Sequence, residues 1–207
     1  MSEYTFEKLP DLREALVKGD VTSALDLVPL VDVEEDAYEY VALVMEIDRM
    51  LMSFYSSGNQ LAVSSTIELI SKTDRLHFSE DWPQFTDLIS KIVGMLAEMD
   101  KGAQRDELLK VVLSKLPLKD RRVSYDENLN FNLACYYAIN DDVKTMTEYV
   151  RRASFYYEKE QFLEDKSFEK YKTEPFFVDV LENIGYTASS WWKCAWPIEE
   201  WYEKITY

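Results

Sequence analysis

The sequence has 207 residues, of which 47% are hydrophobic and 30% are charged, so it can bury a core beneath a solvated surface. Its formal net charge of −16 opposes nucleic-acid binding, and it has no basic patch for phosphates. Charged residues interrupt every apolar stretch before it reaches ~18 residues. Residues 1–10 lack the apolar run of a signal peptide. We therefore expect no nucleic-acid partner, no membrane partner and a cytoplasmic location.

The negative charge is concentrated in one half of the chain. Residues 1–100 contain 20 acidic and 7 basic side chains, a net charge of −13, whereas residues 101–207 contain 19 and 16, a net of −3. An acidic half of this kind attracts a basic partner protein over long distances. The same charge also serves as a solvated surface that keeps a protein soluble, and the sequence leaves both interpretations open.

The first predicted elements form a helical hairpin over residues 10–29. Leu12, Ala15 and Leu16 recur at helical spacing, and Gly19 then ends the first helix. Asp20 can cap the second helix, whose inner face is marked by Ala24, Leu25 and Val28.

The longest predicted helix covers Val33 to Ser57. Its first turn contains three acidic residues, which the helix dipole favours: Glu34, Glu35 and Asp36. Its polar strip on a helical wheel is narrow and consists of Glu35, Glu39, Glu46, Arg49 and Ser53. Most of the remaining circumference is apolar and includes Met45 and Met52, so we expect a central helix that packs on several sides.

Helical periodicity continues to the end of the chain. Further helices are predicted over residues 60–72, 83–99, 103–116, 128–139, 142–157, 175–183 and 197–205, with a short helix around residues 162–171. No segment alternates with period two, and the 5 Gly and 6 Pro residues are too few for the many turns of an all-β fold. The charged segment 118–127 is predicted as an exposed loop between an acidic helical half, 1–117, and a second part, 128–207. We expect one all-α domain over residues 1–207.

The segment Asn130–Ala153 resembles a tetratricopeptide repeat (TPR), which pairs two antiparallel helices in about 34 residues. The family's positions are occupied on the first helix by Leu133, Ala134 and Tyr137, in the turn by Asp141 and Asp142, and on the second helix by Val150 and Ala153. The sequence departs from the family at Met146, where Ala is usual, and at Asn130, where Trp is common.

A second segment, Phe162–Glu182, is similar to the tail that often closes TPR arrays, so the resemblance covers residues 130–183. The resemblance implies a TPR-like α-solenoid of antiparallel hairpins. Because the predicted central helix is too long for a standard repeat, we expect an irregular solenoid with a long central helix and a Trp-rich C-terminal cap. The resemblance also implies a groove that binds a protein or peptide, although a fold alone does not fix a function.

Residues for catalysis or metal binding do not form a recognisable pattern. The chain has one histidine, His77, in a polar segment, and two cysteines, Cys135 and Cys194, that are far apart. This set supplies neither a zinc site nor a nucleophile with its base, and no glycine-rich phosphate loop is present. We expect no catalytic residues, no metal and no cofactor.

Asp48 stands out because it lies among apolar residues of the longest predicted helix. An ionised carboxylate there is costly unless it is paired. One interpretation gives it an internal partner, Arg13, Arg49 or Arg75. The other makes its helix face part of a groove, in which Asp48 receives a lysine or arginine of a partner protein.

Four of the five tryptophans lie close together near the C-terminus: Trp191, Trp192, Trp196 and Trp201. Terminal repeats of helical arrays must cover their open end, and these rings suit such a cap. Tryptophan is also common in binding hot spots, so an interface is the alternative role.

Together these features predict a non-enzymatic module that binds another, basic protein. The candidate binding residues are Glu34, Glu35, Asp36, Glu39, Glu46, Asp48, Trp191, Trp192, Trp196 and Trp201. A specific version is a bacterial immunity protein or antitoxin that neutralises a basic toxin. The alternatives are an enzyme that uses carboxylates in a helical cleft and a homo-oligomeric structural protein.

Overall fold

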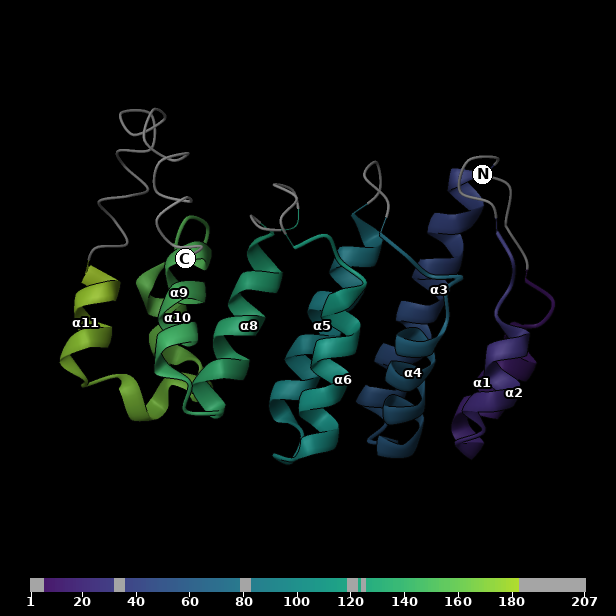
Figure 1. The fold of residues 1–207 in the computed structure, drawn as a ribbon, viewed down its shortest axis with the longest axis horizontal. Helices are drawn as coiled ribbons and strands as arrows, with labels where there is room; N and C mark the ends of the chain where they lie inside the picture. Colours follow the sequence, from purple (N-terminus) through teal and green to yellow (C-terminus); the bar gives the residue numbers. More distant parts are fainter. Residues whose placement is uncertain (1–5, 32–35, 79–82, 119–122, 124–125, 183–207) are drawn as a thin grey trace. The chain divides into compact units, whose positions relative to one another are not determined.

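The described part of the chain is helical throughout (Figure 1). A computed structural model describes residues 6–31, 36–78, 83–118, 123 and 126–182. Every regular element in these ranges is a helix, which confirms the all-α prediction. No helix within them is long and apolar enough to cross a membrane.

The chain divides into two compact units, Met1–Ser124 and Tyr125–Tyr207. The division falls inside the segment 118–127, which the sequence marks as a loop because it is polar and charged. The expectation of one helical-repeat domain over 1–207 stays a prediction, and each unit is described by itself below.

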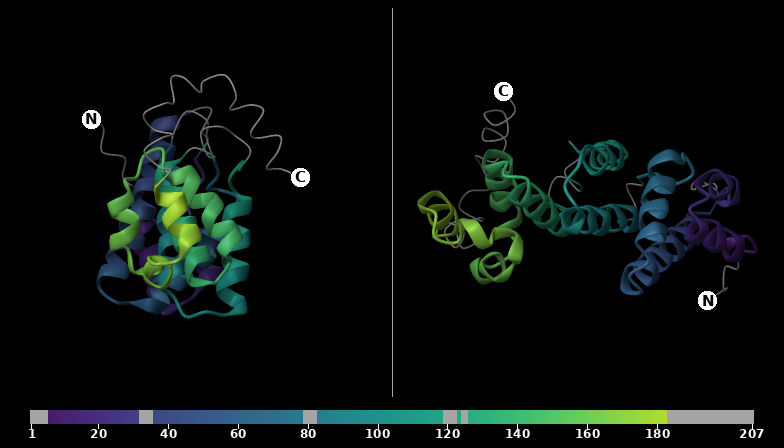
Figure 2. Two further views of the ribbon diagram at one scale, coloured as in Figure 1. Left: turned by 90° about the vertical axis from the view of Figure 1, so that its left-hand side faces the viewer. Right: turned by 90° about the horizontal axis from the view of Figure 1, so that it is seen from below.

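The first unit contains six described helices: α1 Leu9–Lys18, α2 Val21–Leu27, α3 Ala37–Ser56, α4 Gln60–Lys72, α5 Gln84–Glu98 and α6 Ala103–Ser114. Helices α1 and α2 pack against each other and against α4, and the right-hand view of Figure 2 shows α1 and α2 side by side. Helix α3 packs against α4 and α5, and α6 packs against α4 and α5. Within these contacts α1 pairs with α2, α3 with α4 and α5 with α6, as expected for consecutive helical hairpins.

Side-chain caps explain where several of these helices begin. Asp20, Asp36 and Asn59 each accept a hydrogen bond from the backbone N–H three residues later, at 3.0, 2.9 and 3.1 Å. Helix α3 therefore begins at Ala37, and the predicted start at Val33 is wrong, because Asp36 is the residue that caps it.

The buried face of α3 holds the core of the first unit together. Tyr40, Leu43, Ile47, Leu51 and Phe54 are almost completely buried along it. The Tyr40 hydroxyl accepts a hydrogen bond from the His77 N–H at 2.9 Å and also donates to the His77 carbonyl. Burial raises the pKa of Tyr40 to about 12, so it stays a neutral donor and attaches the segment after α4 to α3.

The second unit is built on a hairpin of two helices, α8 Glu127–Ile139 and α9 Val143–Ala153. It continues with α10 Lys159–Glu164, the 3₁₀ helix η1 Lys166–Tyr171, and α11 Pro175–Glu182. Ala134, Val150 and Ala153 are buried in its core, as their small or apolar side chains predict. Met146, at a position where TPR repeats usually carry Ala, is fully buried and fills the same core.

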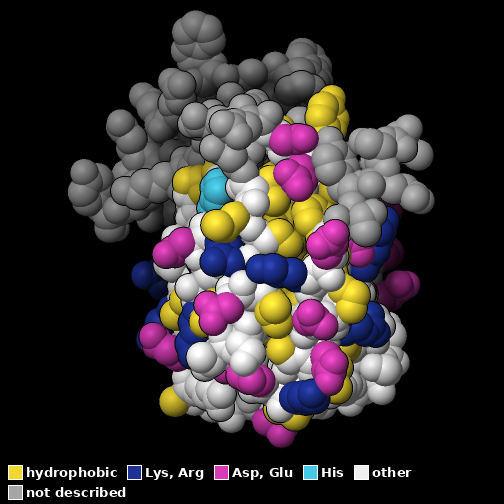
Figure 3. Space-filling model, turned by 90° about the vertical axis from the view of Figure 1, so that its right-hand side faces the viewer, with side chains coloured by type: hydrophobic (Ala, Val, Ile, Leu, Met, Phe, Trp, Pro, Cys, Tyr) yellow, Lys and Arg dark blue, Asp and Glu magenta, His cyan; other side chains and the backbone are white. Residues whose placement is uncertain are grey.

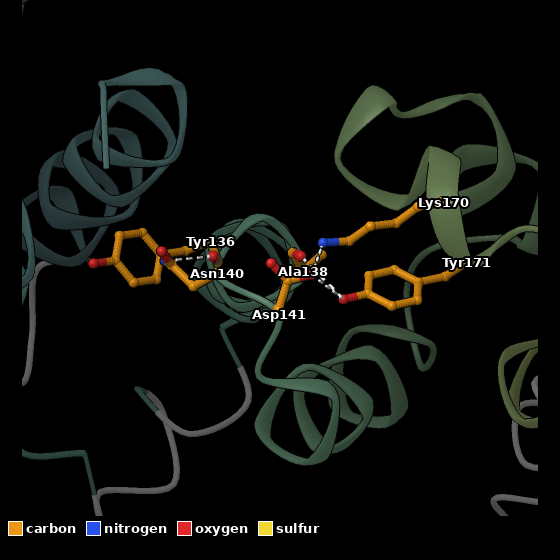
Figure 4. Close-up of polar contacts among 6 residues, drawn as sticks. All are labelled: Tyr136, Ala138, Asn140, Asp141, Lys170 and Tyr171. Atoms are coloured by element: carbon orange, nitrogen blue, oxygen red, sulfur yellow. Dashed lines mark hydrogen bonds and ion pairs between the residues drawn. The ribbon is translucent and has the colours of Figure 1, made fainter. Parts of the chain in front are cut away.

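The turn between α8 and α9 has an unusual backbone at Asp141, whose φ of 64° is in the left-handed region. Its carboxylate pairs with Lys170, and the Tyr171 hydroxyl lies 3.4 Å from the same oxygen and 3.3 Å from the Ala138 carbonyl (Figure 4). The next residue, Asp142, caps α9 by accepting from the Thr145 N–H at 3.1 Å. The two turn aspartates thus serve the fold itself.

Substituting the glycines tests how the first unit packs. Gly19 has a φ of 76°, and a Cβ there would lie 3.2 Å from Leu61 Cδ1, so Gly19→Ala should destabilise the protein by about 2 kcal/mol. Gly58 has a φ of 71° but open space around it, so Gly58→Ala should cost about 1 kcal/mol. Urea unfolding monitored by circular dichroism measures both values.

Gly102 is the matched control, because its backbone is extended at a φ of 175° and a Cβ added there would meet nothing within 4 Å. Gly102 is also the N-cap of α6, where Ala is less favourable than Gly, so Gly102→Ala should cost about 0.5–1 kcal/mol and less than Gly19→Ala. Equal effects at Gly19 and Gly102 would contradict the close contact between α1 and α4.

Candidate functional site

Helix α3 exposes an apolar stripe on the face opposite its buried one. Tyr38, Met45 and Met52 are 68%, 42% and 37% exposed, and their seven-residue spacing puts them on one line along the helix. We call these three residues the α3 stripe. The expectation that α3 packs on several sides is wrong for Met45 and Met52, because α4 and α5 cover only its other faces.

Asp48 lies at the edge of the α3 stripe, one turn from both Met45 and Met52. Its side chain is 25% exposed, and its Oδ2 accepts from Lys91 Nζ on α5 at 2.6 Å. Its other oxygen, Oδ1, is buried and has no hydrogen-bond donor. The carboxylate therefore has an internal cation, but half of its accepting capacity is unused.

Lys91 was not among the partners that the sequence suggested for Asp48. The suggested arginines have other partners: Arg13 donates to Ser53 at 3.0 Å, Arg49 pairs with Glu46, and Arg75 donates to the Val28 carbonyl. Asp48 therefore has an internal partner, but that partner is Lys91 and not Arg13, Arg49 or Arg75. The reason is that α5 brings Lys91 to Asp48 from 43 residues away.

Helices α3 and α5 run parallel and in register along a polar seam. The Tyr55 hydroxyl donates to Glu98, and this pair is separated by 43 residues, as is the pair Asp48–Lys91. Because both pairs have the same separation in sequence, moving seven residues along α3, from Asp48 to Tyr55, corresponds to moving seven residues in the same direction along α5, from Lys91 to Glu98. We call the side chains along this line the α3–α5 seam: Asp48, Tyr55, Gln84, Asp87, Lys91 and Glu98.

The seam holds more acceptors than donors. Burial raises the pKa of Asp87, the negative charge of Asp48 raises it further, and Lys91 acts in the opposite direction. Gln84 Oε1, one turn before Asp87 on α5, is buried without a hydrogen-bond donor. A side chain with several N–H groups would complement this row.

Acidic residues also border the other edge of the α3 stripe. Glu39 and Glu46 are half-buried there, and Glu46 pairs with Arg49. Asp36 is the helix cap, so its carboxylate supports the start of α3. The stripe therefore has carboxylates along both sides. Glu39 and Glu46 lie on one side, and Asp48, Asp87 and Glu98 lie on the other. These five acidic side chains outnumber the two nearby basic ones, Arg49 and Lys91.

Several predicted binding residues lie outside the described part of the chain: Glu34, Glu35, Trp191, Trp192, Trp196 and Trp201. Of the predicted set, the described residues Glu39, Glu46 and Asp48 come together around the α3 stripe. The sequence reasoning missed Tyr38, Asp87 and Lys91. The seven-residue spacing of Tyr38, Met45 and Met52 was a signal that could have identified the stripe.

Other surfaces in the described ranges are less organised. A depression of about 400 Å³ is lined by Phe6, Glu7, Lys8, Asp26, Val28, Pro29, Leu30 and Arg75. Figure 3 shows the end of the molecule that carries α1 and α2, where acidic side chains are scattered among basic and hydrophobic ones. Neither surface combines an apolar line with acidic edges as the α3 face does.

The described residues offer little for catalysis at a metal or a thiol. They contain no group of three or more His, Cys, Asp or Glu side chains that could hold a metal ion. Cys135 is buried, and burial raises the pKa of its thiol, which keeps it protonated and unreactive. Comparison with protein-family models, curated proteins and solved structures found no match for this chain.

The raised pKa of Asp87 predicts a pH-dependent substitution effect. A carboxyl group whose folded pKa is raised contributes most stability below its unfolded pKa and loses that contribution as pH rises through the folded value. Asp87→Asn should therefore raise Tm at pH 7 by about 2 °C, and the gain should shrink as pH falls toward about 4.

Thermal unfolding followed by circular dichroism between pH 4 and 8 measures this difference. Asp100→Asn, at an exposed position after α5, is the control and should show no such trend. A lower Tm for Asp87→Asn at pH 7 would mean that attraction to Lys91 outweighs the cost of burial.

Proposed function

We propose that this chain is a non-enzymatic module that binds a basic partner protein through the α3 face. The observation that carries the proposal is the exposed α3 stripe with carboxylates along both edges. Three large apolar side chains in a line are unusual on a solvated helix and lose their contact with water when a partner covers them.

The residue types of the stripe suit a binding surface. Methionine is flexible and polarisable, so Met45 and Met52 can adapt to the shape of a partner. Tyrosine adds a large contact area with few rotatable bonds, and it is common in binding hot spots.

The acidic edges supply direction and selectivity. Carboxylates beside an apolar line favour partners whose lysines and arginines surround an apolar anchor, and they repel acidic partners. The net charge of −13 over residues 1–100 adds a long-range attraction that speeds the encounter.

We also propose that the helices are arranged as a TPR-like solenoid. The α8–α9 hairpin and the parallel register of α3 and α5 agree with an irregular TPR-like α-solenoid, in which first helices of successive repeats line a binding surface. A Trp-rich C-terminal cap and a cytoplasmic location belong to the same proposal.

A narrower form of the proposal is a bacterial immunity protein or antitoxin. Such a protein neutralises a toxin by covering its active surface, and a nuclease toxin presents a basic surface to its substrate. An acidic surface with an apolar centre complements that toxin site in charge. This form rests on charge and on analogy.

Affinity capture from the native organism's lysate tests the proposal with matched variants. The wild-type chain should capture one dominant basic protein at low salt, and moderate salt should weaken the capture because charge contributes. Met45→Lys should reduce capture by at least about tenfold, since it puts a charge into the apolar line, and mass spectrometry with quantification measures the loss.

Tyr156→Ser is the control, because Tyr156 is an apolar side chain of the second unit that is 54% exposed. It should leave the capture unchanged. A partner that stays bound to Met45→Lys, or an acidic partner insensitive to salt, would argue against the α3 face.

A further inference from the structure

The carboxylate of Asp48 is only half satisfied in the free protein. Its Oδ2 accepts from Lys91 Nζ at 2.6 Å, whereas its Oδ1 is buried and has no donor. An ionised carboxylate accepts hydrogen bonds at both oxygens, and a buried acceptor without a donor is costly. Asp48 therefore suits a cation that reaches both oxygens at once.

Lys91 cannot be that cation in its present geometry. An ammonium group is a compact charge on one nitrogen, while a guanidinium group presents two parallel N–H donors that match the two oxygens of a carboxylate. The Lys91 side chain is 43% exposed, so it can turn into solvent when another cation arrives.

The surroundings of Asp48 favour an arginine over other cations. Met45 and Met52 lie one turn to either side of Asp48 and are exposed, so they can contact the methylene part of a long side chain. Asp87 and Gln84 continue the row of acceptors along α5, and a guanidinium has N–H groups left for a second acceptor.

We propose that an arginine of the partner protein displaces Lys91, reaches the buried Oδ1 of Asp48 through the space that Lys91 leaves, and pairs with both carboxylate oxygens while its methylenes pack between Met45 and Met52. The inference rests on the proposed function, because it names the group that the α3 face receives. The partner is accordingly a protein segment in which an arginine is flanked by apolar residues. An anionic membrane or a nucleic acid is repelled by the same carboxylates.

Chemical rescue tests the cation preference of Asp48 without any partner. Lys91→Ala removes the internal cation and should lower Tm. Ethylguanidinium at tens of millimolar should then raise the Tm of this variant, and the increase should be at least about twice that produced by ethylammonium or sodium chloride at equal ionic strength. The reason is that only ethylguanidinium has two parallel N–H donors in one plane.

Two variants control this measurement. Lys72→Ala breaks a comparable Lys–Glu pair on α4, with Glu68, and should show no specific rescue. The double variant Asp48→Asn with Lys91→Ala should also show none, because its amide lacks the charge. Equal recovery with both organic cations, or no recovery with either, would overturn the preference for arginine.

The capture experiment supplies the second arm. Lys91→Ala should capture the partner at least as well as the wild type, because displacement is no longer needed, while Asp48→Asn should lose capture by about tenfold or more. Equal losses in the two variants would overturn the displacement of Lys91. Rescue without any captured protein would overturn the proposed function, and capture without rescue would overturn only the arginine assignment.

Discussion

The packing of α3 against α4 and α5 through one side only is the constraint on which the first unit depends. Its buried line, from Tyr40 through Ile47 to Phe54, supplies the core contacts. A helix that is apolar on much of its surface but covered on one side must expose the rest. The α3 stripe is therefore a consequence of the same sequence that stabilises the core, and it persists because the buried side holds α3 in place.

The parallel register of α3 and α5 converts this exposed side into a polarised surface. It sets Lys91 opposite Asp48 and Glu98 opposite Tyr55, so charged groups form one border of the apolar stripe. Both helices are held by the burial of their apolar faces, so this border keeps its geometry. Binding groups held on rigid helices retain more of their interaction energy than groups on loops.

Local signals in the sequence predicted much of the fold. Gly19 and Asp20 located the first helical junction, and the turn aspartates located the second unit's hairpin, because helix caps and turn residues are marked by residue types that adjoin the junction itself. The partner of Asp48 could not be obtained in this way. It depends on the rotation and register of α5, and several basic residues compete for one carboxylate on sequence grounds. The exposure of Met45 and Met52 likewise depends on which neighbours reach α3.

The Asp141 turn has a consequence for how the second unit forms. A left-handed residue other than glycine is mildly unfavourable, and here Lys170 and Tyr171 offset that cost from 29 and 30 residues further along the chain. An isolated α8–α9 hairpin lacks these contacts, so the turn at Asp141 is fully stabilised only after η1 has packed against α8. The hairpin and η1 should therefore gain and lose their order together, as one cooperative unit in hydrogen exchange, even though the hairpin is the most local part of the unit.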